Sequence, residues 1–315
     1  MRRSVRRWLG AGVALALTAA IGLPAHAVTG ATTVTENDPV LVAAGDIACD
    51  PADPAFNRGK GTATRCRQAA TAALAASAVP AVLAPLGDIQ YDKASTLALL
   101  GSYDRSWGRL AAPTRPAVGN HEYGTAGALG YFTYFGTAAG APLLGYYSYD
   151  LGSWHVVVLN SNCTVTSCAA GSAQERWLRA DLKAHPTRCT LAYFHHPRFS
   201  SGEHGDNASV APFWKALYDY QADVILAGHD HDYERFAKIR PDGTRDGTNG
   251  IRSWVVGTGG KSLYKFGPLD RNSVVHHGTG FGVLKLRLGR DGYRWKFLGE
   301  PGSTFADSGT GACRA

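Results

Sequence analysis

Two histidines placed two positions apart are the first residues of this sequence that could do chemistry. His229 and His231 follow the apolar run 224–227 and Gly228. An apolar run that stops at a glycine is typical of a buried strand that leads into a loop, and such loops hold the functional residues of open α/β sheets. Two imidazoles in one loop indicate a metal site, although a His-x-His pair alone is often coincidental.

Four other apolar runs end in the same way, at a side chain that can bind metal. These side chains are Asp46, Asp88, Asn120 and His195. A Gly-Asp pair alone usually marks an ordinary turn, because both residues favour turn backbone. Five such strand ends together favour a metal centre, and oxygen ligands mixed with imidazole suit manganese, iron and zinc.

The order of the elements explains how residues so distant in sequence could meet. Strand-like runs cover 39–44, 81–86 and 114–118, and helical periodicity covers 65–79 and 94–107. This βαβαβ beginning predicts a parallel sheet, which gathers the carboxyl ends of its strands at one edge.

The rest of the chain continues this alternation and then becomes strand-rich. We expect further strands at 145–151, 154–160, 190–194 and 224–227, and helices at 173–184 and 211–220. The last third has strand-like runs at 253–256, 282–288 and 293–298 without a clear helix. That pattern predicts a second sheet packed on the first.

The amino terminus has the features of a secretory signal peptide. An arginine-rich start precedes the apolar stretch 8–23, and Ala25-His26-Ala27 is a cleavage signature. The stretch is short and interrupted by glycine and proline, so we expect no stable membrane insertion. We therefore expect a signal peptide at 1–27, a short segment at 28–37 and one domain at 38–315. The protein would be secreted, extracellular or periplasmic, and Arg6-Arg7 also fits the twin-arginine route.

Charge and cysteine content agree with an exported enzyme. The formal net charge is +7, but four basic residues belong to the signal, and the remainder has no basic block, so we expect no nucleic-acid partner. An even number of cysteines in an exported chain predicts disulfides rather than a thiolate zinc site, because no C-x-x-C spacing occurs. Sequence proximity favours Cys49–Cys66 and Cys163–Cys168, which leaves Cys189–Cys313.

Taken in order, the strand ends resemble the five blocks of the calcineurin-like metallophosphoesterases. The blocks are Gly45-Asp46, Gly87-Asp88-Ile89-Gln90-Tyr91, Gly119-Asn120-His121-Glu122, His195 and Gly228-His229-Asp230-His231. Tyr91 and Tyr233-Glu234-Arg235 are similar to the purple acid phosphatase branch. The resemblance implies an α/β fold, a four-layer α/β/β/α sandwich of two packed mixed sheets flanked by helices. One departure is Ala48, where the family usually has glycine, and we expect Cys49 to brace this loop.

The resemblance also implies a centre of two metal ions. One ion would be bound by Asp46, Asp88, Tyr91 and His231, and the other by Asp88, Asn120, His195 and His229. A carboxylate shared by both ions, here Asp88, screens the repulsion of ions ~3.5–4 Å apart. A phenolate at Tyr91 favours Fe(III), whereas an amide with two imidazoles suits a divalent iron, zinc or manganese ion.

A reaction follows from this centre and the remaining polar residues. The resemblance implies an acid phosphatase that hydrolyses phosphate monoesters by attack of a metal-bound hydroxide on a small phosphorylated substrate. His121 would protonate the leaving oxygen, and His196 and His204 would bind the phosphoryl oxygens. Glu122 and Glu234 would orient the histidine ligands.

Two other functions and one misleading motif are weighed against this interpretation. A phosphodiesterase on the same fold is the alternative, and a secreted metal- or phosphate-binding protein without turnover is a third possibility. The segment Gly257–Ser262 imitates a phosphate-binding loop, but no helix follows it, so we expect a tight turn that passes near the site. The absence of G-x-S-x-G disfavours a serine hydrolase, and nothing in the sequence indicates an oligomeric state.

Overall fold

The computed structural model describes Met1 and residues 34–187 and 189–314. The expected cleavage site and twin-arginine pair therefore lie outside the described residues, and the boundaries at 27 and 37 stay predictions. The described residues from Val34 onward form one compact unit. Within the described part of the chain, no helix is long and apolar enough to cross a membrane.

A five-stranded sheet joins the two ends of this unit. Its strand order is β12-β11-β10-β1-β2, and only β1 and β2 pair in parallel. The strands are β1 (Val40–Ala44), β2 (Val82–Pro85), β10 (Gly282–Leu288), β11 (Gly292–Gly299) and β12 (Ser308–Ala312). The two amino-terminal strands consist of buried apolar residues, as expected where both faces of a sheet are covered.

A seven-stranded sheet of order β3-β4-β5-β6-β8-β7-β9 forms the second layer. Its strands are β3 (Tyr147–Leu151), β4 (Trp154–Val158), β5 (Cys189–Tyr193), β6 (Val224–Ala227), β7 (Tyr233–Phe236), β8 (Arg252–Val256) and β9 (Ser273–His277). The strands β4, β5, β6 and β8 are parallel, and the outer pairs are antiparallel.

Aromatic side chains hold the two sheets face to face. The ring of Trp154 in β4 lies 5.7 Å from that of Tyr293 in β11, and Trp254 in β8 lies 5.5 Å from Trp295. All four side chains are buried in one apolar core. Burial of several large aromatic residues at one interface makes this contact a main source of stability.

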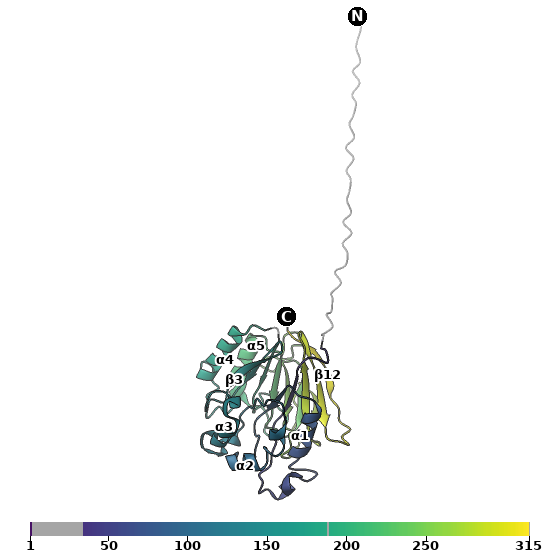
Figure 1. The fold of residues 1–315 in the computed structure, drawn as a ribbon. Helices are drawn as coiled ribbons and strands as arrows, with labels where there is room; N and C mark the ends of the chain where they lie inside the picture. Colours follow the sequence, from purple (N-terminus) through teal and green to yellow (C-terminus); the bar gives the residue numbers. More distant parts are fainter. Residues whose placement is uncertain (2–33, 188, 315) are drawn as a thin grey trace. The chain divides into compact units, whose positions relative to one another are not determined.

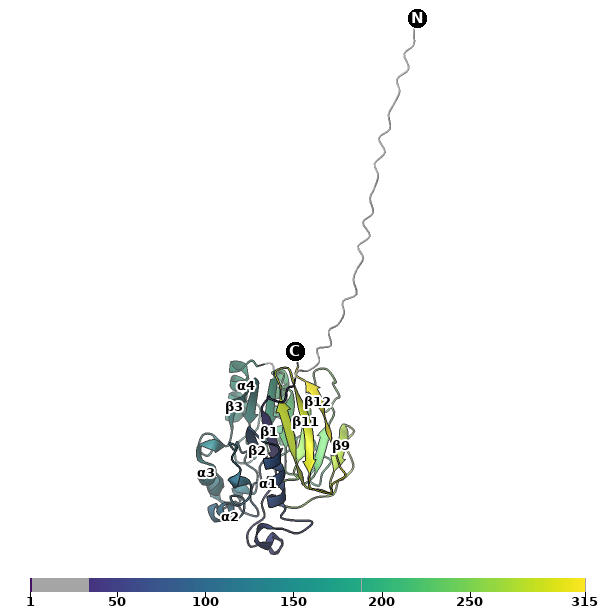
Figure 2. The ribbon, with the colours of Figure 1, turned by 45° about the vertical axis from the view of Figure 1, so that its right-hand side comes forward.

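Helices cover the outer faces of both sheets. A second core joins the seven-stranded sheet to α4 (Ala173–Ala184) and α5 (Ala211–Asp219), through residues such as Leu178 and Phe213. The helix α1 (Gln68–Ser77) lies on the five-stranded sheet, and α2 (Thr96–Gly101) packs on α3 (Leu129–Phe135). Figures 1 and 2 show α4 beside β3, away from α1. The predicted four-layer sandwich of two mixed sheets is confirmed.

Several element predictions need correction. Residues 114–118 form only isolated bridges, one to Leu83 of β2 and one to Leu86 just after it, because Pro113 and Pro116 lack the N–H groups of a continuous ladder. The helix expected at 94–107 ends at Gly101, a residue that favours helix ends. The strands of the last third do not form a separate sheet: β8 joins the seven-stranded sheet, whereas β10 and β11 extend from β1.

All three predicted disulfides are present, namely Cys49–Cys66, Cys163–Cys168 and Cys189–Cys313. The third joins β5 to the chain just after β12 and so links the two sheets. Three disulfides suggest an extracellular protein, because such bonds persist in oxidising compartments.

Candidate metal centre

The strand ends of both sheets meet at one point. Asp46 and Asp88 follow β1 and β2 of the five-stranded sheet, and His195 and His229 follow β5 and β6 of the other. The loops pack so closely that a Cβ on Gly228 would lie 2.7 Å from the side-chain oxygen Oδ2 of Asp46. Asp46, Asp88 and His229 have φ angles of 61°, 47° and 74°, and such left-handed backbone at non-glycine residues is typical of functional sites.

One group of donors surrounds the hydroxyl of Tyr91. Tyr91 Oη lies 2.8 Å from Asp46 Oδ1, 3.0 Å from Asp88 Oδ2 and 2.9 Å from His231 Nε2. The four side chains are those that the sequence predicts for the first metal ion. All four are buried, so their polar atoms face one another rather than water.

A second group of donors surrounds the ring of His195. His195 Nε2 lies 3.2 Å from Asp88 Oδ2, 3.0 Å from Asn120 Oδ1 and 3.2 Å from His229 Nδ1. These are the residues predicted for the second ion. Asp88 Oδ2 belongs to both groups and lies between them.

The hydrogen bonds at Nδ1 of His195 and His231 leave Nε2 of each ring as the atom that can bind a metal ion. His195 Nδ1 lies 2.9 Å from the carbonyl oxygen of Leu86, and His231 Nδ1 lies 2.9 Å from Ser262 Oγ. A proton on Nδ1 puts the lone pair on Nε2, which faces the other donors. Anionic oxygens and imidazole lone pairs that converge in a buried site fit metal ions well, because a cation removes their repulsion.

The pKa shifts show how strongly these groups interact without a cation. Burial would raise the pKa of Asp88, but His195 and His121 hold it well below its usual range. Burial would lower the pKa of His195, yet Asp88 and Asp46 raise it to about 9. Burial and the two carboxylates raise the pKa of Tyr91 well above its usual value, so a phenolate there requires a bound cation.

The three histidines predicted to act on substrate border the same cluster. His121 is partly exposed, with Nδ1 2.7 Å from the Asp92 carbonyl oxygen and Nε2 3.8 Å from Asp88 Oδ2. The rings of His196 and His204 lie 4.4 and 4.2 Å from the ring of His229. The sequence prediction thus names ten residues that the structure brings together.

His196 is also placed to bind metal, which the sequence interpretation did not consider. Its ligand atom lies within 4.8 Å of those of His195 and His229. Burial, together with His195, lowers the pKa of His196 to about 3, so the ring is neutral and keeps a lone pair. Ser161 Oγ, 2.9 Å from His196 Nδ1, fixes the orientation of the ring.

The expectation that Glu122 and Glu234 orient histidine ligands is wrong. Glu122 accepts hydrogen bonds from the backbone N–H groups of Asp88 and Gly119, at 2.9 and 2.7 Å, and so holds the two metal-binding loops together. Glu234 accepts from the backbone and hydroxyl of Ser201. Their oxygens are thus committed to loop backbone and to a serine.

The residues that do orient histidines escaped prediction, because they lie far away in sequence. Asp230 Oδ1 lies 2.9 Å from His204 Nδ1, and Ser262 binds His231. The glycine-rich segment 257–262 does pass near the site, as predicted: a Cβ on Gly259 would lie 2.2 Å from the Gly45 carbonyl oxygen. Glycine is required there because the two backbones touch.

Comparisons with known proteins agree with this geometry. Residues 34–233 match a family profile described as calcineurin-like phosphoesterase. An uncharacterised protein of Mycobacterium tuberculosis is 31% identical over 189 residues, which are 48% of this chain and 36% of the relative. Purple acid phosphatase 22 of Arabidopsis thaliana is 28% identical over 174 residues, 51% of this chain and 39% of that protein.

The fold has a counterpart among solved structures. Purple acid phosphatase PPD1 of yellow lupin, Lupinus luteus, superposes with a TM-score of 0.69 at 18% identity, covering 88% of this chain and 54% of the lupin chain. That likeness is one of fold. The chain spans well under half the length of the two curated relatives described above.

Proposed function

Because the chain belongs to the calcineurin-like phosphoesterase family, we propose that it is a phosphatase that hydrolyses phosphate monoesters at a centre of two metal ions. The observation that carries the proposal is the position of Asp88 Oδ2, 3.0 Å from Tyr91 Oη and 3.2 Å from His195 Nε2. A carboxylate oxygen shared by two groups of donors is what a pair of neighbouring ions requires.

The two donor groups divide between a trivalent and a divalent ion. Asp46, Asp88, Tyr91 and His231 would hold Fe(III), and Asp88, Asn120, His195 and His229 would hold divalent iron, zinc or manganese. The phenol oxygen and two carboxylates give the first group more anionic character than the amide and imidazoles give the second. Bound there, the ions supply Lewis-acid activation of water and of the phosphoryl group.

His121 is the proposed proton donor to the leaving group. Its Nδ1 donates to the Asp92 carbonyl oxygen, so the orientation of the ring is fixed and Nε2 faces the Asp88 side of the centre. As an imidazolium, His121 can pass the Nε2 proton to the leaving oxygen of the ester. Its partly exposed edge lets the ring recover a proton from solvent.

His196 and His204 would bind the oxygens of the transferred phosphoryl group. Both rings lie against His229, and their Nδ1 atoms are engaged by Ser161 and Asp230, which directs Nε2 away from those partners. Ser161 can donate to His196 Nδ1, so His196 carries its proton on Nε2 and donates it to a phosphoryl oxygen. His204 Nδ1 donates to the Asp230 carboxylate, so His204 donates through Nε2 as an imidazolium. Two donors for one phosphate favour the dianionic end of a monoester.

Rates with two chromogenic esters test the activity. The protein purified with its metals should hydrolyse nitrophenyl phosphate at least about tenfold faster than bis-nitrophenyl phosphate, since only the monoester presents a dianion. A preference for the diester would instead assign a phosphodiesterase, and hydrolysis of neither would assign a metal- or phosphate-binding protein without turnover.

His121→Ala tests the role of His121 as the general acid separately from metal binding. Loss of a general acid lowers kcat about 10²- to 10⁴-fold, and metal content should stay unchanged because His121 is outside both donor groups. His276→Ala, at an exposed histidine on β9, is the matched control and should leave kcat unchanged.

We also propose that the protein is exported and that residues 1–27 are its signal peptide. The three disulfides support this localisation, because they require an oxidising compartment to persist. The amino-terminal sequence of protein recovered from the culture medium or periplasm tests the cleavage site, which we place after Ala27.

A further inference from the structure

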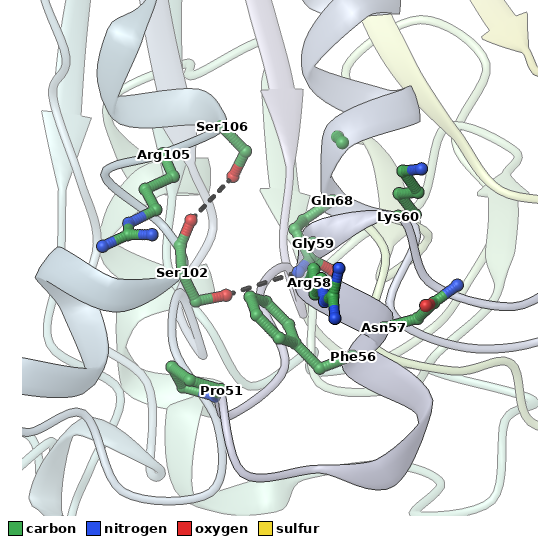
Figure 3. A pocket seen from close by; sticks show the side chains of 11 residues that line it. Pro51, Phe56, Asn57, Arg58, Gly59, Lys60, Gln68, Ser102, Arg105 and Ser106 are labelled. Atoms are coloured by element: carbon green, nitrogen blue, oxygen red, sulfur yellow. Dashed lines mark hydrogen bonds between the residues drawn. The ribbon is translucent and has the colours of Figure 1, made fainter.

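A cavity of about 550 Å³ lies outside the candidate metal centre, and none of the ten residues of that site lines it. The cavity opens between a short helical segment at Pro54–Gly59, the beginning of α1 and the turn after α2 (Figure 3). Its charged lining residues are all basic, namely Arg58, Lys60 and Arg105. Its volume is in the range of sites for small organic ligands.

Within the described part of the chain, the three basic side chains around the cavity have no carboxylate partner. An anionic ligand would supply the missing negative charge. Two neighbouring arginines do have one: Arg65 pairs with Asp53 at 3.0 Å, and Arg67 pairs with Glu300 at 2.8 Å. Asp53 and Glu300 are thus paired with arginines that do not line the cavity. Three like charges around one hollow produce a positive potential, which attracts anions.

The beginning of α1 adds uncharged donors to the same wall. Its cap residue, Arg67, makes no side-chain capping hydrogen bond, and the backbone N–H groups of Gln68 and Ala69 have no acceptor in the described part of the chain, whereas those of Ala70 and Thr71 donate to the Arg67 carbonyl oxygen. Gln68 and Ala69 of this first turn line the cavity. Unpaired N–H groups at a helix start favour phosphate, because the helix dipole is positive there.

Gln68 has an unused polar atom in this wall. The residue is 1% exposed, its Nε2 donates to Ser102 Oγ at 3.3 Å, and its Oε1 has no hydrogen-bond partner. Figure 3 shows the amide joined to Ser102 across the back of the cavity. The opposite amide orientation would let Oε1 accept from the Ser102 hydroxyl and would turn the NH₂ group to a ligand. In that orientation Oε1 is paired with Ser102 and a phosphate oxygen accepts from the NH₂ group, so no buried polar atom of the amide stays unpaired.

From these contacts we propose that the cavity binds a phosphorylated small organic molecule at a second site. The phosphate would lie among Arg58, Arg105 and the first N–H groups of α1. The organic part would pack on Phe56 and Pro51, which supply the apolar side of the lining. The inference is independent of the proposed reaction, because the ligand here is bound and not cleaved.

Calorimetric titration with phenylphosphonate tests the site, since this probe carries a phosphonate dianion and an aromatic ring but cannot be hydrolysed. The metal-loaded wild-type protein should bind one molecule at the metal centre and a second at the cavity. The double substitution R58Q/R105Q should weaken the second event by at least about tenfold, because two charge-assisted contacts are lost. Unchanged thermal unfolding would show that the double variant is folded.

Two further variants show which of the two sites gives each binding event. R176Q/K183Q removes the same charge from the exposed face of α4, away from the cavity lining, and should bind both molecules as the wild type does. Asp88→Ala should lose only the binding of phenylphosphonate at the metal centre. If the wild type also shows no binding at the metal centre, the proposed function fails and the cavity proposal stands. A single event that R58Q/R105Q leaves unchanged, or an equal loss in R176Q/K183Q, would overturn the cavity proposal.

Discussion

At the scale of single residues, Asp88 organises the candidate metal centre because its two oxygens have separate tasks. Oδ1 accepts the His121 backbone N–H at 2.8 Å, which fixes the rotation of the carboxylate. Oδ2 is then left between the two donor groups. His195 and His121 lower the pKa of Asp88 despite its burial, so the group stays ionised in neutral and mildly acidic solution.

Tyr91→Phe tests the identity of the first ion. Wild-type protein with Fe(III) in this position should show a visible tyrosinate-to-iron absorption band, and the variant should lose the band because its ring has no oxygen. Tyr264→Phe is the matched control: Tyr264 stacks on His231 at 3.9 Å but belongs to neither donor group, so its variant should keep the band. A colourless and fully active wild type would contradict Fe(III) at this position.

Glu122→Gln tests the buried brace between the metal-binding loops. The Glu122 carboxylate accepts hydrogen bonds from the backbone N–H groups of Asp88, Gly119 and Ile89. In the variant, the NH₂ group of the amide is a donor and cannot accept from these N–H groups. Loss of such support typically lowers metal affinity about 10- to 100-fold. Competition with a metallochromic chelator measures this change, and an unaltered affinity would show that the loops hold their positions without Glu122.

The donors themselves were predictable from sequence, but their supports were not. Asp46, Asp88 and His229 stand directly after apolar runs, and a sheet gathers such positions at one edge. The contacts of Ser262 with His231 and of Asp230 with His204 have no such sequence signal, because they depend on how distant loops fold over the centre.

At the scale of elements, a buried histidine joins three of them. His155 in β4 lies 2.9 Å from Asp150 of β3, through Nδ1, and 2.8 Å from Asp181 of α4, through Nε2. Burial lowers the pKa of His155, but hydrogen bonds to Asp181 and Asp150 raise it above its usual value. The imidazolium therefore stabilises the packing of α4 on the edge of the seven-stranded sheet.

The contribution of His155 to stability should depend on pH. Because its pKa is raised in the folded protein, His155 contributes fully to the free energy of unfolding at pH values below its pKa in the unfolded chain. This contribution is lost as the pH rises through its pKa in the folded protein. His155→Gln should lower the free energy of unfolding by about 1–3 kcal/mol near pH 5.5 and by clearly less near pH 9. Urea titrations at both values measure the difference. Equal losses would assign the effect to packing alone.

Strand prediction succeeded where apolar residues form a continuous buried run, as in β1 and β6. It missed β7, whose polar residues are buried in internal contacts: Glu234 binds Ser201, and Arg235 pairs with Asp307 at 2.8 Å. It also missed the edge strands β9 and β12, which alternate between partly buried and exposed positions and contain glycine or histidine. Hydrophobic pattern alone cannot identify strands that are stabilised in these ways.

At the scale of the whole molecule, contacts between distant parts of the chain hold the two sheets together. The pairing of β1 with β10 joins residues near the two ends of the domain. Such pairing was not predictable from sequence, because the apolar pattern of a strand shows which of its faces are buried but does not identify the strand that pairs with it. The prediction of a second sheet was therefore right about its existence and wrong about its members.

Removal of the third disulfide tests this long-range link. Cys189 and Cys313 are 124 residues apart, whereas Cys163 and Cys168 are five apart. Closure of the longer loop restricts the unfolded chain more, so C189A/C313A should cost about 5 kcal/mol and C163A/C168A about 2 kcal/mol. Denaturant unfolding of both variants gives the two values. An equal cost would mean that local strain, not chain entropy, sets the stability.

If Asp88 bridges two metal ions, both ions depend on this one carboxylate, and the metal content of Asp88→Ala is the decisive measurement. Elemental analysis of wild-type protein should find two equivalents of metal per chain, and the variant should contain neither ion and have no phosphatase activity, because both donor groups lose their shared ligand. A folded Asp88→Ala protein that retains two equivalents of metal would contradict the account.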